Sequence, residues 1–122
     1  MESSIVYEKA KAFSIRIVKL ADYLNDKKSF TLSNQILRSG TSIGANLAEA
    51  QCSYSKRDFL NKVQISFKEC SETLYWLDLL YDTENINGKE YESMKSDCQE
   101  LFKLLSAITK TTRSNIYTSK QK

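Results

Sequence analysis

Histidine and proline are both absent from this chain of 122 residues, and only three glycines occur. Without histidine there is no imidazole general base, no Ser-His-Asp or Cys-His nucleophile, and no Glu-x-x-His ligand set for a di-iron bundle. Most catalytic zinc sites are excluded for the same reason. With so few backbone breakers, the sequence favours long helices over many short strands. We expect a protein that is not an enzyme and that uses no metal or other cofactor.

Cysteine is scarce as well. The chain has three cysteines, Cys52, Cys70 and Cys98, which are far apart in sequence. Their odd number and wide spacing argue against a disulfide framework and fit a reducing cytosol. We interpret Cys70 and Cys98 as small core residues rather than redox groups. No apolar run approaches the roughly 18 residues that span a bilayer, and the first residues lack the pattern of a signal peptide. We therefore expect a cytoplasmic protein with no membrane partner.

Four stretches of the chain carry apolar residues at spacings of three and four, the heptad pattern of helices that pack together. The stretches run from about Ser4 to Asn25, Leu32 to Gln51, Lys56 to Tyr81 and Gly88 to Ser114. The predicted seam positions, in chain order, are Val6, Ala10, Phe13, Ile17, Leu20, Leu24, Leu32, Ile36, Gly40, Ile43, Leu47, Ala50, Phe59, Val63, Phe67, Cys70, Leu74, Leu77, Tyr81, Tyr91, Met94, Cys98, Leu101, Leu105, Ile108 and Thr112. Short loops between them predict one all-α domain, an antiparallel up-down four-helix bundle, with a frayed tail from about residue 115.

Small residues form a ridge on the second predicted helix. Gly40, Gly44 and Ala48 stand four residues apart, although a glycine inside a helix is unfavourable by about 1 kcal/mol relative to alanine. We interpret the ridge as a site of close helix approach and not as a phosphate loop, because no Gly-x-x-x-x-Gly-Lys pattern follows a strand here. Ser55 and Asn87 are the expected N-caps of the third and fourth helices.

A polar stripe lies beside this ridge. Its members are Gln35, Arg38, Ser42, Asn46 and Glu49, at spacings of 3, 4, 4 and 3 that keep them on one helix face. The stripe is either a solvated face or a hydrogen-bonded seam between helices or subunits. Its short, polar side chains favour the seam.

The stretch from Gln35 to Ala50 resembles the four-helix-bundle family of proteins encoded in intervening sequences of bacterial 23S rRNA genes. The family's text here is close to Arg-x-x-x-Ser-Ile-x-x-Asn-Ile-Ala-Glu-Gly. The matching residues are Arg38, Ser42, Ile43, Asn46, Ala48 and Glu49. Leu47 replaces isoleucine and Ala50 replaces glycine, and the Ser-x-x-Asp-Phe-Leu run at 55–60 is also similar to the family.

This resemblance implies a pentameric ring of bundles with no known enzymatic activity. It also implies association with nucleic acid, since relatives are encoded in rRNA genes. The accessory proteins of diversity-generating retroelements, which work beside a reverse transcriptase, are similar too. The expected partners are therefore other copies of the chain, in a homo-oligomer, and RNA or DNA.

Charge is divided unevenly along the chain. Residues 1–68 carry a net charge of +5, residues 69–100 carry −7, and residues 101–122 carry +5, for a total of +3. An up-down bundle gathers basic residues at one end, and we call this set the basic pole. It consists of Lys9, Lys11, Lys56, Arg57, Lys62, Lys110 and Arg113. We predict that it binds nucleic acid. The alternative is a set of ordinary solvated helix ends, since cations near a helix C-terminus are favourable anyway.

Apolar residues also lie outside the seams. Ile15 and Val18 are at or beyond the edge of the first seam, and Ile65 and Trp76 share a second face of the third helix. We predict that these four residues contact another subunit, because tryptophan is enriched at interface hot spots. Alternatively, Trp76 closes the edge of the bundle.

Two hypotheses for function remain open at this point. One is an oligomeric bundle that associates with RNA or DNA, and the other is a protein scaffold or adaptor with no direct nucleic-acid binding. An enzyme built on Glu49, Glu69 and Glu72 has little support, because no seam position pairs two of these carboxylates.

Overall fold

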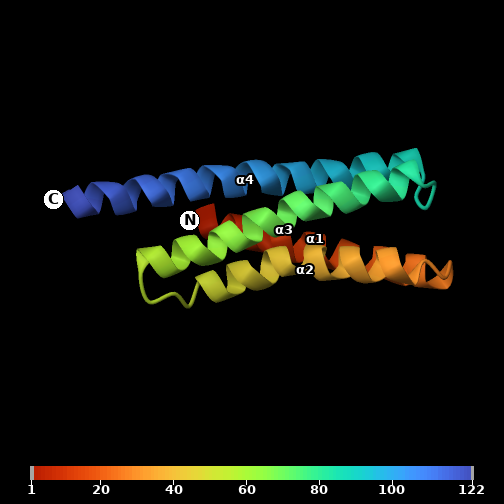
Figure 1. Ribbon diagram of the computed structural model, residues 1–122, viewed down its shortest axis with the longest axis horizontal. Coiled ribbons are helices and arrows are strands. Elements are labelled where there is room, and N and C mark those ends of the chain that lie inside the picture. Colours follow the sequence, from red (N-terminus) through yellow and green to blue (C-terminus); the bar gives the residue numbers. More distant parts are fainter. Residues whose placement is uncertain (1, 122) are drawn as a thin grey trace.

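The computed structural model describes residues 2–121, with side chains for residues 5–118. It contains four helices: α1 (Glu2–Asp26), α2 (Phe30–Ala50), α3 (Lys56–Asp82) and α4 (Gly88–Gln121). Residues 2–121 contain no strand. Successive helices run in opposite directions (Figure 1). The predicted all-α, antiparallel up-down four-helix bundle is confirmed.

The helices form a closed square. α1 packs on α2, α2 on α3 and α3 on α4, while α4 completes the circuit against α1. Both chain ends and the α2–α3 loop lie at one end of the bundle, on the left in Figure 1, and the other two turns lie at the opposite end. α4 runs past the other helices (Figure 1) and continues through Gln121. The prediction that this helix ends near Ser114 is wrong, because no glycine or proline follows to stop it.

The predicted seams account for most of the core. Every seam residue of α1, from Val6 to Leu24, is buried, and so are the seam residues of α4 from Tyr91 to Ile108. On α3 the seam prediction is partly wrong. Tyr81 is exposed, and Phe67 and Leu74 are only half-buried, while Ser66, Thr73 and Leu80 beside them are buried.

The buried face of α3 differs from the predicted one because two hydroxyl side chains on it form hydrogen bonds with α2. The Ser66 hydroxyl donates to the Ile43 carbonyl at 2.8 Å, and the Thr73 hydroxyl lies 3.0 Å from that of Ser39. Each buried hydroxyl is thereby satisfied, so its burial carries little penalty. On the other side of α2, Gly40 and Gly44 face α1, which confirms the predicted close approach.

Helix starts and turns follow the sequence. The Ser55 hydroxyl accepts from the Asp58 N–H at 3.0 Å, and the Asn87 side chain accepts from the Glu90 N–H at 2.8 Å, so both predicted N-caps are confirmed. α1 ends two residues before Lys28 and α3 ends two residues before Glu84, and these two residues adopt φ angles of 65° and 61°. A residue in this left-handed conformation ends a helix sharply. The turns thus hold the four helices in register.

Candidate functional site

The polar stripe of α2 contacts α3 through its two charged residues, Arg38 and Glu49. The Arg38 guanidinium donates to Glu69 at 3.3 Å and also pairs with Glu72. Three turns along, Glu49 accepts from the Lys62 ammonium at 3.1 Å. Both charged residues of the stripe therefore bridge α2 and α3, as expected of a seam between helices.

The middle of the stripe bonds within its own helix. The Ser42 hydroxyl donates to the Arg38 carbonyl, and the Asn46 amide donates to the Ser42 carbonyl at 2.8 Å. Among the described residues, neither side chain forms a hydrogen bond to α3. The polar seam therefore consists of ion pairs between α2 and α3 at two places. Between these places, the hydroxyl and amide groups of Ser42 and Asn46 form hydrogen bonds to the backbone of α2 itself.

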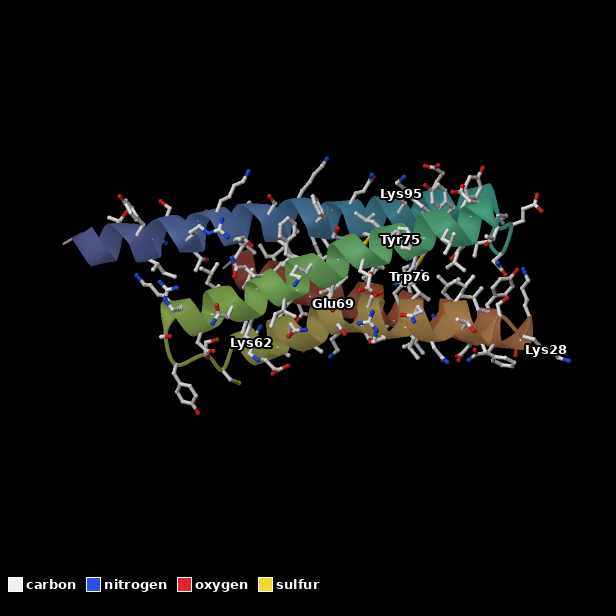
Figure 2. The ribbon with its side chains drawn as sticks, in the orientation of Figure 1. Lys28, Lys62, Glu69, Tyr75, Trp76 and Lys95 are labelled. Carbon is white, nitrogen blue, oxygen red and sulfur yellow. The ribbon has the colours of Figure 1, made fainter. Side chains whose placement is uncertain are left out.

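On α3 the partners of Arg38 belong to a stripe that begins and ends with apolar residues. Ile65, Glu69, Glu72 and Trp76 are spaced 4, 3 and 4 apart and so share one face. The Trp76 indole N–H donates to Glu72 at 2.9 Å. Figure 2 shows Glu69 and Trp76 along the side of α3 that faces α2. Arg38 and Trp76 thus hold Glu72 from two sides.

The chain matches a known protein family over most of its length. A family model described as "23S rRNA-intervening sequence protein" matches residues 2–107, which include the polar stripe, helices α1 to α3 and the first part of α4. The chain belongs to the 23S rRNA-intervening sequence protein family. The resemblance seen in the sequence of α2 is therefore confirmed.

One solved member extends the comparison to three dimensions. A protein of unknown function from the S23 ribosomal protein family of Bacteroides thetaiotaomicron VPI-5482 has a crystal structure that is similar, with a TM-score of 0.87. It is 50% identical, and the match covers 90% of this chain and 99% of that chain. No curated protein matches the chain. The similarity to this solved structure thus extends over nearly the whole fold.

The basic pole of this family member divides into paired and unpaired residues. Lys9 lies 3.1 Å from Glu100, and Lys62 lies 3.1 Å from Glu49. The other five residues are exposed, and no carboxylate described in residues 5–118 lies within ion-pairing distance of them. They are Lys11, Lys56, Arg57, Lys110 and Arg113. The unpaired charge comes from α1, α3 and α4.

The four residues predicted to contact another subunit lie on two separate surfaces. Ile15 and Val18 are exposed on the outer side of α1, and Ile65 is exposed on α3. Trp76 is half-buried, packs against the core, and meets Tyr75 edge-on with ring centroids 5.0 Å apart. α1 and α3 are diagonal in the bundle, and their backbones do not approach each other closely. Each of these helices therefore carries its own apolar patch: Ile15 with Val18 on α1, and on α3 Ile65 and Trp76, which Glu69 and Glu72 separate.

At the opposite end of the bundle, Tyr91 connects α4 to α3. Its hydroxyl donates to Asp78 at 2.6 Å and accepts from Lys95 at 2.7 Å, while the Tyr81 ring stacks on it at 4.4 Å. The hydrogen bond to Asp78 raises the pKa of Tyr91. The pKa of Lys95 is also raised, mainly by its hydrogen bond to Tyr91 and to a lesser extent by that to Asp78. This cluster ties α3 to α4, and nothing in the sequence pattern had pointed to it.

The cysteines fall into two environments. Cys52 is exposed, whereas Cys70 and Cys98 are buried with their Sγ atoms 3.8 Å apart. Each buried thiol also lies near the other's backbone carbonyl, at 3.4 and 3.6 Å. The hydrogen bond with Cys70, followed by burial, raises the pKa of the Cys98 thiol. A thiol held protonated is a poor nucleophile and metal ligand, which agrees with the interpretation of the pair as core residues.

Neither a metal site nor a membrane helix is found in the described part of the chain. Among its residues, no three histidine, cysteine or acidic side chains gather where they could hold a metal ion. No helix formed by these residues is both long and apolar enough to cross a bilayer.

Proposed function

We propose that this protein is a non-enzymatic subunit of a homo-oligomeric ring that associates with RNA or DNA through its basic pole. The observation that carries the proposal is the set of five unpaired cations of the basic pole: Lys11, Lys56, Arg57, Lys110 and Arg113. Unpaired lysines and arginines are free to neutralise phosphates and release counterions. All three cysteines are free thiols, which fits the reducing cytoplasm in which we place the protein.

The association with nucleic acid is tested by measuring the binding of short RNA and DNA strands at two salt concentrations. The test variant replaces Lys56, Arg57, Lys110 and Arg113 with glutamine. Its matched control replaces four exposed cations nearer the opposite end, Lys19, Lys27, Lys28 and Lys89. We expect the salt dependence of binding to fall for the test variant, by about 0.7–0.9 in logarithmic slope for each phosphate that is no longer neutralised, and to change little for the control.

Two results would contradict this part of the proposal. Equal losses in both variants would mean that binding follows net charge and not the pole. A wild-type protein that assembles but shows no binding at low salt would instead be a scaffold or adaptor.

The ring is supported by the two different apolar patches. A two-fold dimer buries the same patch on both subunits, and so it would leave the other patch exposed. A head-to-tail contact buries one patch of each kind, and it closes into a ring when the rotation allows. Ile15 and Val18 on α1 would then meet Ile65 and Trp76 on α3 of the next subunit. Family resemblance favours five copies, and a ring would place five basic poles on one surface and raise the local potential.

Assembly is tested by mass measurement on a sizing column with light scattering. Wild-type protein is expected at five copies of the 14.0 kDa chain. Ile15→Asp and Ile65→Asp change exposed residues, so each variant is expected to stay helical but to become monomeric. Trp76→Ala is a poorer choice, because Trp76 also packs against the core.

Mixing the two variants distinguishes the contact types. In a head-to-tail contact, the intact α3 patch of Ile15→Asp binds the intact α1 patch of Ile65→Asp, so the mixture forms dimers that cannot extend. Dimers in either variant alone would mean that a patch binds its own copy, which contradicts the ring. A wild-type protein that stays monomeric at high concentration would contradict any assembly.

A further inference from the structure

A pocket opens between α3 and α4 near the basic pole. It has a volume of about 420 Å³ and is lined by Gln64, Phe67 and Lys68 of α3 and by Ser106, Thr109, Lys110 and Arg113 of α4. Residues 64 and 68 lie one turn apart on α3, as do residues 106 and 110 on α4, so each helix presents one edge of the pocket. Phe67 forms an aromatic wall, and its ring rests on Phe102 with centroids 4.8 Å apart.

Thr109 gives this pocket an unused hydrogen-bonding group. The residue is only 5% exposed, and its Oγ1 has no hydrogen-bond partner in the described structure. A helical threonine commonly bonds back to the carbonyl one turn earlier, as Thr41 does to Leu37 at 2.6 Å. Leaving a buried hydroxyl unsatisfied is destabilising. Rotation about its χ1 bond exchanges Oγ1 with the methyl group, so a bound ligand could take up the hydroxyl.

The charge around the pocket is of one sign. Lys68, Lys110 and Arg113 have no carboxylate within ion-pairing distance among residues 5–118. Residues 101–122 contain no aspartate or glutamate, and residues 56–68 contain only Asp58. Asp58 is engaged at the start of α3, where it accepts from the Tyr54 N–H at 3.4 Å. Three cations and an aromatic ring therefore surround one open space, and Thr109, which also lines it, keeps its orphaned hydroxyl buried in the present rotamer.

We propose that this pocket binds one unpaired nucleotide of a single-stranded nucleic acid, with its phosphates on Lys68, Lys110 and Arg113 and its base against Phe67. This inference rests on the proposed function and specifies where and in what form the strand is held. Cations that track the backbone, combined with an aromatic face for a base, are the usual means of binding single strands. Gln64 and Thr109 supply polar groups for the edges of the base or sugar.

The aromatic ring is what favours a single strand over a duplex. In a duplex each base is stacked between its neighbours and cannot reach a side chain set between two helices unless it is first unstacked, which is unfavourable. A purely electrostatic surface would bind duplex as well as single strand. The pocket also extends the basic pole, because Lys68 lies inward of the helix ends from which the pole was defined.

The experiment compares two double variants that lose the same charge. Lys68→Gln with Lys110→Gln removes cations from the pocket, and Lys11→Gln with Lys56→Gln removes unpaired cations outside it. The probe is a short mixed-sequence RNA strand, with its duplex and a nucleoside monophosphate as further probes, and fluorescence anisotropy reports binding. We expect the pocket variant to lose at least several-fold more affinity for the strand than the control, and we expect wild type to prefer the strand over the duplex.

Thr109→Val provides a second variant that does not threaten the fold. Valine has nearly the same shape and removes an unsatisfied hydroxyl, so the melting temperature is expected to hold or rise. Affinity for the strand is expected to fall. An unchanged affinity would remove Thr109 from the site.

The outcomes separate this inference from the function on which it rests. Equal losses in the pocket variant and the control, with binding intact in wild type, would overturn the pocket and leave the basic pole. Equal binding of strand and duplex would overturn the base contact. Binding of the monophosphate as tightly as the strand would assign the pocket to a free nucleotide instead. No binding of any probe by wild type at low salt would overturn both proposals.

Discussion

Ile17 of α1 occupies the space that a side chain at Gly40 of α2 would need. A β-carbon placed on Gly40 would lie 2.7 Å from Cγ1 of Ile17 and 2.9 Å from its Cγ2. Ile17 is fully buried, and its branched side chain has little freedom to turn away. The two helices can approach this closely only because residue 40 has no side chain.

Gly40→Ala is therefore expected to destabilise the protein, although alanine is the better helix former. Overpacking a core typically costs about 1–3 kcal/mol, which outweighs the gain of about 1 kcal/mol in helix propensity. Gly44→Ala is the matched control, because its new β-carbon would lie 3.4 Å from the Ser14 hydroxyl and 3.6 Å from the Ala10 backbone, which are normal contacts. We expect that variant to be neutral or more stable. Urea unfolding measures both, and equal effects would mean that the crowding at Gly40 is relieved elsewhere.

The Tyr91 cluster predicts a loss of stability at alkaline pH. Both Tyr91 and Lys95 have raised pKa values in the folded state, above their ordinary values of 10.0 and 10.5. The folded protein therefore binds more protons than the unfolded chain once the pH passes about 10, so the free energy of unfolding falls as the pH rises further. Below that pH the contribution of the cluster is fully present.

Tyr91→Phe tests this pH dependence because it removes the hydroxyl that links Asp78 and Lys95. We expect the variant to be less stable than wild type at neutral pH, and the difference between them to shrink above pH 10. Tyr117→Phe, at an exposed tyrosine, is the control and is expected to follow wild type at every pH. A constant difference between Tyr91→Phe and wild type across the alkaline range would rule out a contribution from this titration.

Thiol reactivity provides a check on the packing of α3 against α4. In native protein an alkylating reagent is expected to modify Cys52 and to spare Cys70 and Cys98, which are buried and whose contact raises the Cys98 pKa. In urea all three are expected to react. Peptide mass spectrometry gives the site of labelling. Native labelling of Cys98 at a rate close to that of Cys52 would mean that α3 and α4 separate often under native conditions.

The sequence predicts the number, order and inner faces of the helices because heptads of large apolar residues have one way to be buried. The prediction of the buried face fails on α3, because Ser66 and Thr73 are polar residues, which usually lie at the surface, but are buried in the core. Their burial depends on the Ile43 carbonyl and the Ser39 hydroxyl of α2. Such a partner, more than twenty residues away, cannot be recognised from the pattern of α3 alone.

The candidate site was predictable in part for a similar reason. Helix ends identify which basic residues gather at one pole, but only the packed structure pairs Lys9 with Glu100 and Lys62 with Glu49. Lys68 was missed because it lies inside α3 and not at its end. A signal for it was present, since it is next to Phe67 and stands one turn from Gln64. The resemblance in α2 identifies the family, but it does not indicate which surface residues lie together in the folded protein.

The long α4 has an evolutionary consequence. Ile108 and Thr109 are its last buried residues, and the family match ends at residue 107. Arg113 and Tyr117 lie beyond both limits and are exposed. The C-terminal end of α4 extends past the other helices (Figure 1). Substitutions at exposed positions of this segment alter surface chemistry without disturbing the core, so natural selection can change this surface while leaving the folding of the bundle intact. The segment is the natural place for relatives with a common scaffold to diverge.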